Sequence, residues 1–180
     1  MSRPGPGPAL GRAEDALSVL RAQGLTLATA ESLTGGLVGA ALTTVAGSSD
    51  VYRGGVVCYA TDLKATLAGV PAEVLAEHGP VAPETAAALA SGVARACSAD
   101  VGAATTGVAG PSGQDGHPVG EVYVAVARGD AEPEVRALHL DGDRDAIRAL
   151  TVEAVLALLA EVVAADASGT QCRPALPRQG

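Results

Sequence analysis

The chain has 180 residues, with 12 basic and 20 acidic side chains that give a formal net charge of −8. This length suits one domain that buries roughly two-thirds of the surface its unfolded chain exposes, so the fold needs no disulfide or metal staple. The acidic charge and the scattered basic residues exclude the positive stripe of a nucleic-acid-binding surface. The three cysteines are odd in number and far apart, which excludes a disulfide framework and favours a reducing compartment.

Apolar residues make up 48% of the chain, yet aromatic residues make up only 2%, with no Phe or Trp. The core must therefore be built from Ala, Val and Leu, which suit closely packed layers of helices and sheet. The N-terminus lacks an apolar signal core, and no run of about 18 apolar residues could cross a bilayer. The composition predicts a soluble, cytoplasmic protein without a membrane partner.

The apolar pattern predicts helices alternating with strands in a single domain over residues 10–166. The Pro- and Gly-rich ends, residues 1–9 and 167–180, are predicted to be disordered tails. The first expected elements, in chain order, are a helix over 11–24, a strand over 25–30, a helix over 37–45 and a strand over 54–60. The next are two short helices over 62–69 and 71–79 and a longer helix over 83–99 that starts at Pro83.

The second half of the pattern ends in a hairpin and a helix. A strand over 101–106 is followed by a loop over 107–120, whose five glycines and two prolines rule out regular structure. The strands over 121–127 and 134–140 are joined by too short a connection for a parallel crossover. A final helix over 143–165 begins with Asp143 as its N-cap. The pattern predicts an α/β fold, a three-layer α/β/α sandwich whose mixed sheet ends in an antiparallel hairpin.

A polar turn with the sequence ESLTGG, residues 31–36, separates the first strand from the second helix. Free backbone N–H groups and the positive dipole end of the helix allow such a turn to bind an anion or stabilise an oxyanion. Ser32 stands where a nucleophile would be presented, although the G-x-S-x-G spacing is absent. The alternative is that Ser32 or Thr34 caps the helix while the glycines permit close packing, and the turn alone favours this simpler explanation.

Lys64 is the only lysine among 12 basic residues. Guanidinium cannot lose its proton in a protein, whereas a desolvated ammonium can have its pKa lowered and then act as a base. Serine with lysine is a known pair of nucleophile and base, and Tyr59, five residues before Lys64, could join their hydrogen-bond network. The alternatives are an exposed lysine on a short helix and an ordinary half-buried strand tyrosine.

The loop that begins TTGVAGPSG follows a strand, so its backbone could approach a ligand at the carboxyl edge of the sheet. It lacks both the Walker ending and the G-x-G-x-x-G spacing. The three histidines share no metal-ligand spacing, and only His117 stands in this loop. Capping of the last helix explains the acidic residues Asp143 and Asp145 better than a metal cluster does.

Five segments occur in an order that resembles the CinA C-terminal domain family, also called the PncC family, over roughly residues 10–165. They are AESLTGG, VAGSSDVYRGGVVCYATDLK, LAEHGPVAPETA, TGVAGPSG and PVGEVYVAVA. The resemblance implies hydrolysis of the carboxamide of nicotinamide mononucleotide to nicotinic acid mononucleotide and ammonia. It also implies that Ser32 of the A-E-S motif is the nucleophile and works with Tyr59 and Lys64 of the Y-x-x-x-x-K motif.

The implied mechanism has neutral Lys64 taking the proton of Ser32 as Ser32 attacks the amide carbonyl, then giving a proton to the departing ammonia. Backbone N–H groups around Thr34, Gly35 and Gly36 are the expected oxyanion donors, and losing one donor typically costs roughly 10²–10³ in rate. The scheme needs no metal and no cofactor. The loop from Thr106 to Gly113 is expected to hold the ribose phosphate or the pyridinium amide. The full set of expected substrate-binding residues is Thr34, Gly35, Gly36, Thr61, Thr106, Gly107, Gly110 and Gly113.

The sequence also departs from the family pattern. Leu33 stands where many relatives have Cys, and Thr61 replaces a common Asn, keeping a hydroxyl but losing an amide. The loop reads GQDGHP in place of a longer acidic insert. These departures bear on rate and nucleotide preference more than on the reaction class. The resemblance implies a small-molecule nucleotide as the partner, no nucleic acid, and a homo-oligomer.

Two other readings remain open at the level of sequence. One is a non-catalytic module that binds a pyridine nucleotide without turning it over. The other is a structural subunit in which Ser32 only caps a helix. The presence of the serine, the tyrosine and the lysine together favours the enzyme.

Overall fold

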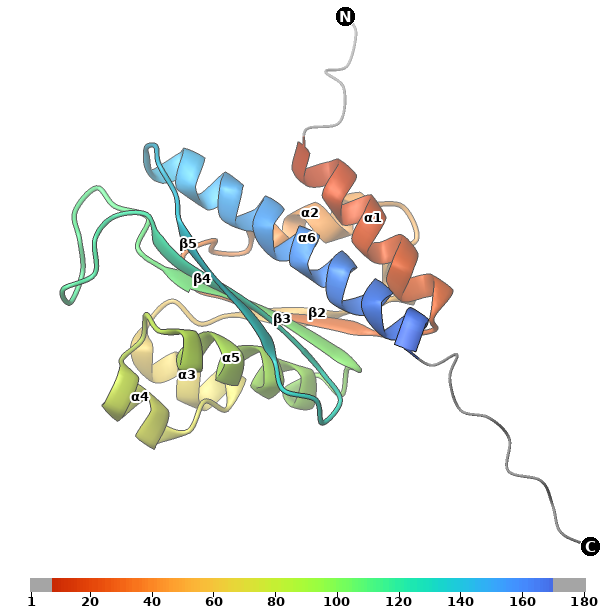
Figure 1. Cartoon of the computed structure of the whole chain (residues 1–180), viewed down its shortest axis with the longest axis horizontal. Helices are drawn as coiled ribbons and strands as arrows, with labels where there is room; N and C mark the ends of the chain where they lie inside the picture. Colours follow the sequence, from red (N-terminus) through yellow and green to blue (C-terminus); the bar gives the residue numbers. More distant parts are fainter. Residues whose placement is uncertain (1–7, 170–180) are drawn as a thin grey trace, which may run out of the picture.

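The computed structural model describes residues 8–169, which form one sheet between two layers of helices (Figure 1). The helices are α1 (Pro8–Ala22), α2 (Leu37–Thr44), α3 (Thr61–Ala68), α4 (Ala72–His78), α5 (Pro83–Ala96) and α6 (Arg144–Gly169). The strands are β1 (Leu27–Glu31), β2 (Tyr52–Val57), β3 (Val101–Gly107), β4 (Glu121–Arg128) and β5 (Glu134–His139), and a 3₁₀ turn (Ser48–Asp50) precedes β2.

The sheet is mixed, with the strand order β2-β1-β3-β4-β5. β1 pairs in parallel with both β2 and β3, because helical connections carry the chain back between these strands. β4 pairs antiparallel with β3 and with β5, and the β4–β5 connection is the predicted hairpin. The predicted mixed sheet that ends in an antiparallel hairpin is confirmed.

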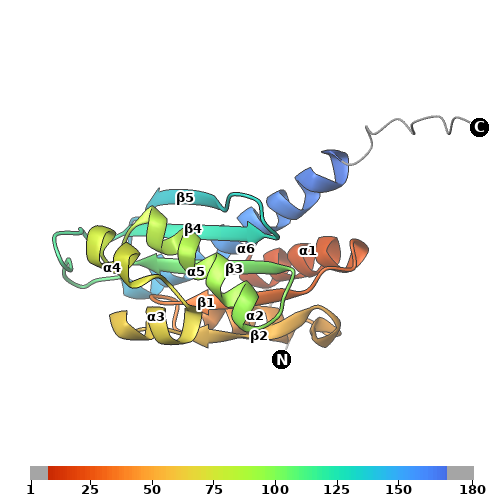
Figure 2. The ribbon, with the colours of Figure 1, turned by 90° about the horizontal axis from the view of Figure 1, so that it is seen from below.

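Both faces of the sheet are covered by helices. α1, α2 and α6 pack on one face, and α3, α4 and α5 pack on the other (Figures 1 and 2). On the α5 side the sheet contributes mostly alanine, and Gly102 of β3 leaves no room for a Cβ between itself and the carbonyl of Ala90 in α5. Small side chains thus let α5 lie close to the sheet, so a core without Phe or Trp is filled. The predicted α/β/α sandwich is confirmed.

Helix ends follow the caps that the sequence predicted. Gly24 adopts a left-handed φ of +66°, and the N–H groups of Gly24 and Leu25 bond the last carbonyls of α1. Pro83 is the first residue of α5. Asp143 Oδ1 accepts the N–H of Ala146 at 2.9 Å, which confirms the predicted N-cap and fixes where α6 starts.

The predicted bounds of the second strand were wrong at both ends. β2 begins at Tyr52 and ends at Val57, since its register with β1 runs from the pair Leu27–Tyr52 to the pair Glu31–Val57. Cys58 therefore lies beyond the end of the strand. Of the predicted tails, residues 8 and 9 belong to α1, 167–169 belong to α6, and the rest lies outside the described residues. Among the helices of residues 8–169, none combines the length and apolar character needed to cross a membrane.

The carboxyl ends of three neighbouring strands meet at one edge of the sheet. Glu31 at the end of β1 pairs with Val57 of β2 and with Thr105 of β3. Because the three strands are parallel and in register there, the segments that follow them leave the sheet side by side. This is the edge at which open α/β sheets bind ligands.

Candidate active site

A pocket opens at this edge and collects most of the predicted site residues. Seven of them line it: Ser32, Tyr59, Thr61, Lys64, Thr106, Gly107 and Gly110. The remaining walls come from Leu33, Pro80, Val81, Val108, Ala109, Ser112, Gln114 and Arg144. Four predicted residues, Thr34, Gly35, Gly36 and Gly113, are not among the lining residues, and their contacts are described below.

Ser32 follows β1 at the start of two consecutive backbone turns. Its N–H donates to the carbonyl of Thr105 at 3.1 Å, which extends the pairing of β1 with β3 by one residue. The N–H of Gly35 then closes the first turn on the carbonyl of Ser32 at 3.1 Å. Gly35 and Gly36 have φ values of +59° and +99°, a conformation that favours glycine. The two glycines thus shape the turn that places Ser32, a residue only 8% exposed, in the pocket wall.

The carboxylate of Glu31 caps α2. Its Oε2 accepts the N–H groups of Gly36 at 2.9 Å and Val38 at 3.0 Å, and its Oε1 accepts that of Gly39 at 2.9 Å. An anion at this position also offsets the positive end of the helix dipole. Two consequences follow: the N–H of Gly36 is bonded within the fold, and no side chain at Ser32 or Thr34 serves as the cap that the simpler reading assigned to them. The hydroxyl of Thr34 instead bonds that of Thr105 at 2.8 Å.

Lys64 lies in the first half of α3 and is 1% exposed. Its Nζ donates to the carbonyl of Cys58 at 3.4 Å, and among residues 8–169 no carboxylate forms an ion pair with it. Burial lowers the pKa of Lys64 below its ordinary value, against a smaller opposing effect of Cys58. Burial in turn raises the pKa of the Cys58 thiol, whose S–H donates to the carbonyl of Glu31 at 3.7 Å. Both effects favour uncharged groups, and a neutral amine is the form of lysine that can accept a proton.

Tyr59 and Arg144 form the rim of the pocket. Tyr59 is 58% exposed, and its hydroxyl accepts a hydrogen bond from Arg144 Nη2 at 2.7 Å. The other terminal nitrogen of Arg144 donates to the carbonyl of Gly110 at 2.6 Å. Sequence reasoning missed Arg144, which is the first residue of α6 and lies 85 residues from Tyr59 in the chain. The only signal near it was the N-cap at Asp143, which fixes its position.

The segment after β3 closes the pocket from the third side. Thr106 Oγ1 donates to the carbonyl of Pro80 at 2.6 Å, which ties the end of β3 to the chain before α5. A Cβ on Gly107 would lie 2.5 Å from the carbonyl of Glu121, so only glycine fits between β3 and β4 at this point. A Cβ on Gly113 would lie 2.6 Å from the carbonyl of His117. Gly113 therefore allows the loop to close on itself, a role apart from the pocket wall.

The side chain of His117 in this loop bonds a carboxylate of β4. His117 Nδ1 lies 2.9 Å from Glu121 Oε1, and the hydroxyl of Tyr123 donates to the same oxygen at 2.8 Å. These hydrogen bonds lower the pKa of Glu121 below its ordinary value, the bond from Tyr123 having the larger effect. Within residues 8–169, no group of three or more His, Cys, Asp or Glu side chains could hold a metal ion. His117 thus anchors the loop to β4.

The sequence model of the CinA C-terminal domain matches residues 11–163, which span nearly all of the described fold. The chain belongs to this family. A CinA-like protein of Frankia casuarinae is 45% identical over 148 residues, which are 82% of this chain and 34% of the relative. A CinA-like protein of Myxococcus xanthus is 44% identical over 144 residues, 79% of this chain and 34% of the relative. This chain thus spans about a third of the length of these relatives.

Solved structures of the family have the same fold at the size of this chain. The competence/damage inducible protein CihA from Agrobacterium tumefaciens superimposes with a TM-score of 0.82 at 36% identity, covering 91% of this chain and 99% of that one. A CinA superfamily protein from Enterobacter cloacae gives a TM-score of 0.83 at 30% identity, covering 91% of this chain and 96% of that one. The predicted family and fold are confirmed. The names of these proteins refer to competence and damage and state no reaction.

Proposed function

We propose that this protein hydrolyses the carboxamide of nicotinamide mononucleotide to nicotinic acid mononucleotide and ammonia, with Ser32 as the nucleophile and Lys64 as the base. The observation that carries the proposal is the amine of Lys64, which is buried without a carboxylate partner in the pocket that also holds Ser32. Burying an amine without an ion-pair partner lowers the stability of the fold. A titratable group with a pKa perturbed by burial, sitting in a cleft, is a candidate for catalysis.

The reaction runs through an acyl-enzyme. The neutral Nζ of Lys64 accepts the proton of Ser32 Oγ while Oγ forms a bond to the carboxamide carbon, and the carbonyl electron pair moves onto oxygen. When this oxyanion collapses, the C–N bond breaks and Lys64 returns the proton to the leaving nitrogen, which departs as ammonia. Lys64 next takes a proton from water as the oxygen of that water attacks the acyl carbon. As this second intermediate collapses, the bond between the acyl carbon and Ser32 Oγ breaks and Lys64 returns the proton to Oγ. The carboxylic acid product gives its own proton to solvent and leaves as the carboxylate.

Recognition of the nucleotide falls to the rim and the loop. Among residues 8–169, Arg144 is the only basic side chain besides Lys64 that lines the pocket, and a guanidinium suits a phosphate group. The exposed ring of Tyr59 stands beside Arg144, where it can contact the pyridinium face. We therefore assign Tyr59 to substrate contact at the rim. The backbone of residues 106–110 and Thr61 complete the expected substrate-binding surface.

The setting of the reaction is part of the same proposal. Cys58 and Cys97 are free thiols, which suits a reducing, cytoplasmic compartment. The family resemblance also implies a homo-oligomer, which sedimentation of the purified chain would test.

The deciding experiment measures ammonia and nicotinic acid mononucleotide released from nicotinamide mononucleotide by the purified protein. Ser32→Ala and Lys64→Met are assayed beside Ser49→Ala, a matched change at an exposed serine of the 3₁₀ turn. We expect the wild type and Ser49→Ala to release both products, and the two site variants to release them at least roughly 100-fold more slowly while staying folded. Binding of the nucleotide without any release by the wild type would favour a module that only senses pyridine nucleotides.

A further inference from the structure

Two backbone N–H groups beside Ser32 are without a hydrogen-bond acceptor in the described part of the chain, those of Leu33 and Thr34. Every other N–H from Ser32 to Ala40 donates to a carbonyl or to the carboxylate of Glu31. The N–H of the residue after a nucleophile is a common oxyanion donor, and Leu33 lines the pocket together with Ser32. The oxyanion donors expected at Gly35 and Gly36 are bonded inside the fold, which leaves the N–H groups of Leu33 and Thr34. Of these two residues, Leu33 lines the pocket, whereas Thr34 is fully buried and does not line it.

Arg148 of α6 binds two backbone carbonyls of this turn. Its Nε donates to the carbonyl of Leu33 and its Nη2 donates to the carbonyl of Thr34, both at 3.1 Å. A Cβ added to Gly35 would lie 3.5 Å from the same Nη2, so the guanidinium lies against the turn. Arg148 stands one helical turn after Arg144 on the same face of α6. The first turns of α6 therefore contact both the turn that carries Ser32, through Arg148, and the rim of the pocket, through Arg144.

The two bonds of Arg148 set the direction of both unpartnered N–H groups. The carbonyl of Leu33 and the N–H of Thr34 belong to one planar trans peptide, so they point in opposite directions. The carbonyl of Thr34 shares a peptide with the N–H of Gly35, which donates to the carbonyl of Ser32 at 3.1 Å. The carbonyl of Ser32 in turn shares a peptide with the N–H of Leu33. One guanidinium thus orients the N–H of Thr34 directly and that of Leu33 through a single turn bond.

The positive charge of Arg148 also strengthens the N–H donors of the peptides that it binds. Its nearest carboxylate, Asp145 Oδ1, lies 3.7 Å away on a side chain that is 91% exposed, so the guanidinium is little neutralised. A cation that hydrogen-bonds a carbonyl polarises the peptide, which makes its N–H a stronger donor. From these observations we propose that Arg148 is a positioning residue: it holds the turn so that the N–H of Leu33 serves as an oxyanion donor beside Ser32. The inference rests on the proposed amidase function.

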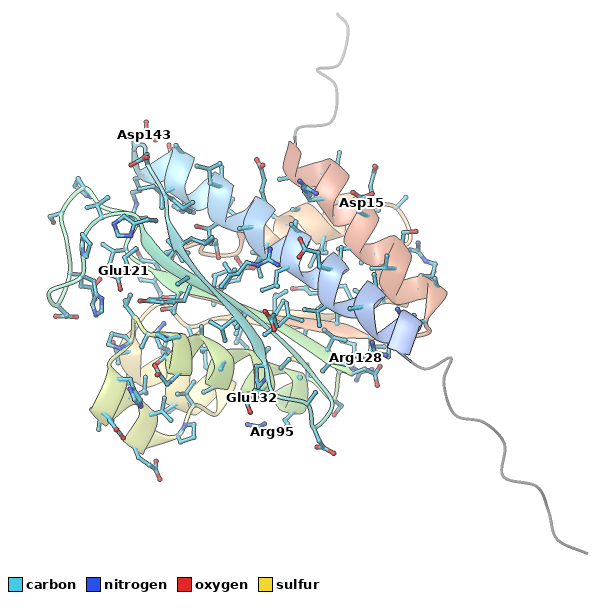
Figure 3. All side chains as sticks on the ribbon, viewed as in Figure 1. Asp15, Arg95, Glu121, Arg128, Glu132 and Asp143 are labelled. Atoms are coloured by element: carbon cyan, nitrogen blue, oxygen red, sulfur yellow. The ribbon has the colours of Figure 1, made fainter. Side chains whose placement is uncertain are left out.

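The test uses Arg148→Met and Arg148→Lys, with Arg95→Met as a control at the opposite end of the sheet from Asp143 and the start of α6 (Figure 3). The first readout is hydrogen exchange of the Gly35 amide, which does not depend on activity. Losing both bonds should speed this exchange roughly tenfold or more in Arg148→Met, because the turn opens more easily. Lysine cannot span two carbonyls, so Arg148→Lys should fall between wild type and Arg148→Met.

The second readout is the split between kcat and KM with nicotinamide mononucleotide. Arg148→Met should lower kcat about 10- to 100-fold with little change in KM, since misplaced donors weaken binding only of the transition state. Arg148→Lys should regain part of this loss, and Arg95→Met should match the wild type. If Arg148→Met does not fold, Arg148→Lys carries both readouts.

The outcomes separate this proposal from the proposed function. A folded Arg148→Met variant with unchanged Gly35 exchange overturns the positioning role, whatever the activity. Faster exchange with unchanged kcat in an active enzyme overturns the oxyanion role. A wild-type protein without amidase activity refutes the proposed function, and Gly35 exchange alone then decides whether Arg148 holds the turn.

Discussion

The two backbone segments that meet over the pocket are built in opposite ways. The turn after β1, residues 32–36, is short, and Ser32, Leu33 and Thr34 are all buried. Charged side chains hold it from both ends, Glu31 at the amides of α2 and Arg148 at its carbonyls. The segment after β3, residues 108–120, is longer, and its stretch 111–116 is exposed. A backbone bridge between Gln114 and His117 closes its tip, and side-chain bonds from Arg144 and to Glu121 hold it at Gly110 and His117.

This difference assigns the two segments different tasks. Chemistry needs a nucleophile and oxyanion donors fixed to within a fraction of an ångström, which a buried and doubly held turn provides. Recognition of a nucleotide tolerates an exposed loop that adjusts to its ligand. We therefore expect changes around the turn to lower kcat and changes in the loop to raise KM. The following predictions test that division, starting with the largest effect.

Lys64→Met should lower kcat by roughly 10²–10⁴, the usual contribution of a general base. Affinity for the nucleotide should change little, because Arg144 and the loop remain. Rates come from the ammonia assay and affinity from calorimetry. Loss of affinity in place of rate would move Lys64 from the catalytic role to the binding role.

The same variant should also be more stable than the wild type at neutral pH, by about 1–3 kcal/mol, since the cost of burying a polar group is removed. Between the lowered pKa of Lys64 in the fold and its ordinary value in the unfolded chain, the unfolded chain binds more protons at this residue. Wild-type stability should therefore rise with pH across that window, and the advantage of the variant should shrink. Urea unfolding of both proteins at pH 7 and at alkaline pH measures this difference in the free energy of unfolding. An advantage that grows with pH would contradict the assignment.

Glu31→Gln should lower kcat about tenfold or more and cost about 1–3 kcal/mol of stability. Both carboxylate oxygens of Glu31 accept N–H groups, whereas a glutamine side chain has one acceptor oxygen and places an NH₂ donor where the other oxygen was. The matched control is Glu73→Gln on the exposed surface of α4. Steady-state kinetics and thermal unfolding of the two variants give the comparison. An active, equally stable Glu31→Gln protein would show that the carboxylate is not needed to hold the turn.

Arg144→Met should raise KM about tenfold or more while kcat falls much less, since it removes one charge-assisted contact and releases both Tyr59 and the Gly110 carbonyl. The KM of nicotinamide riboside, which lacks the phosphate, should be nearly the same for variant and wild type. An equal rise in KM for both substrates would place the phosphate elsewhere.

Gln114→Ala should give the smallest effect, a rise in KM of roughly threefold with kcat unchanged and stability within about 0.5 kcal/mol of the wild type. Gln114 lines the pocket but is exposed, and its side chain bonds only Asp115 in the described structure. A fall in kcat as large as that of Glu31→Gln would contradict the division of tasks, in which residues 32–36 serve catalysis and residues 108–120 serve nucleotide recognition.

The sequence predicted the layers of the fold and most helix ends, because apolar periodicity and caps are local properties. It also indicated Ser32 and Lys64, since a strand-to-helix turn and a single lysine are visible without a structure. It could not reveal the tasks of Glu31 or Arg148. The side chain of Glu31 folds back over the turn that follows it, and Arg148 reaches carbonyls 114 and 115 residues away. The amides expected to bind an oxyanion were therefore counted as free when the fold already uses two of them.

The most direct test is an NMR titration of the one lysine in the chain. Labelling lysine with ¹³C at Cε gives a single side-chain signal, that of Lys64. A base in this pocket requires a midpoint below the ordinary value of about 10.4 that coincides with the rising limb of the pH profile of kcat/KM. A midpoint at or above that ordinary value would mean that Lys64 is protonated during turnover, and it would contradict the account of Ser32 and Lys64 as nucleophile and base.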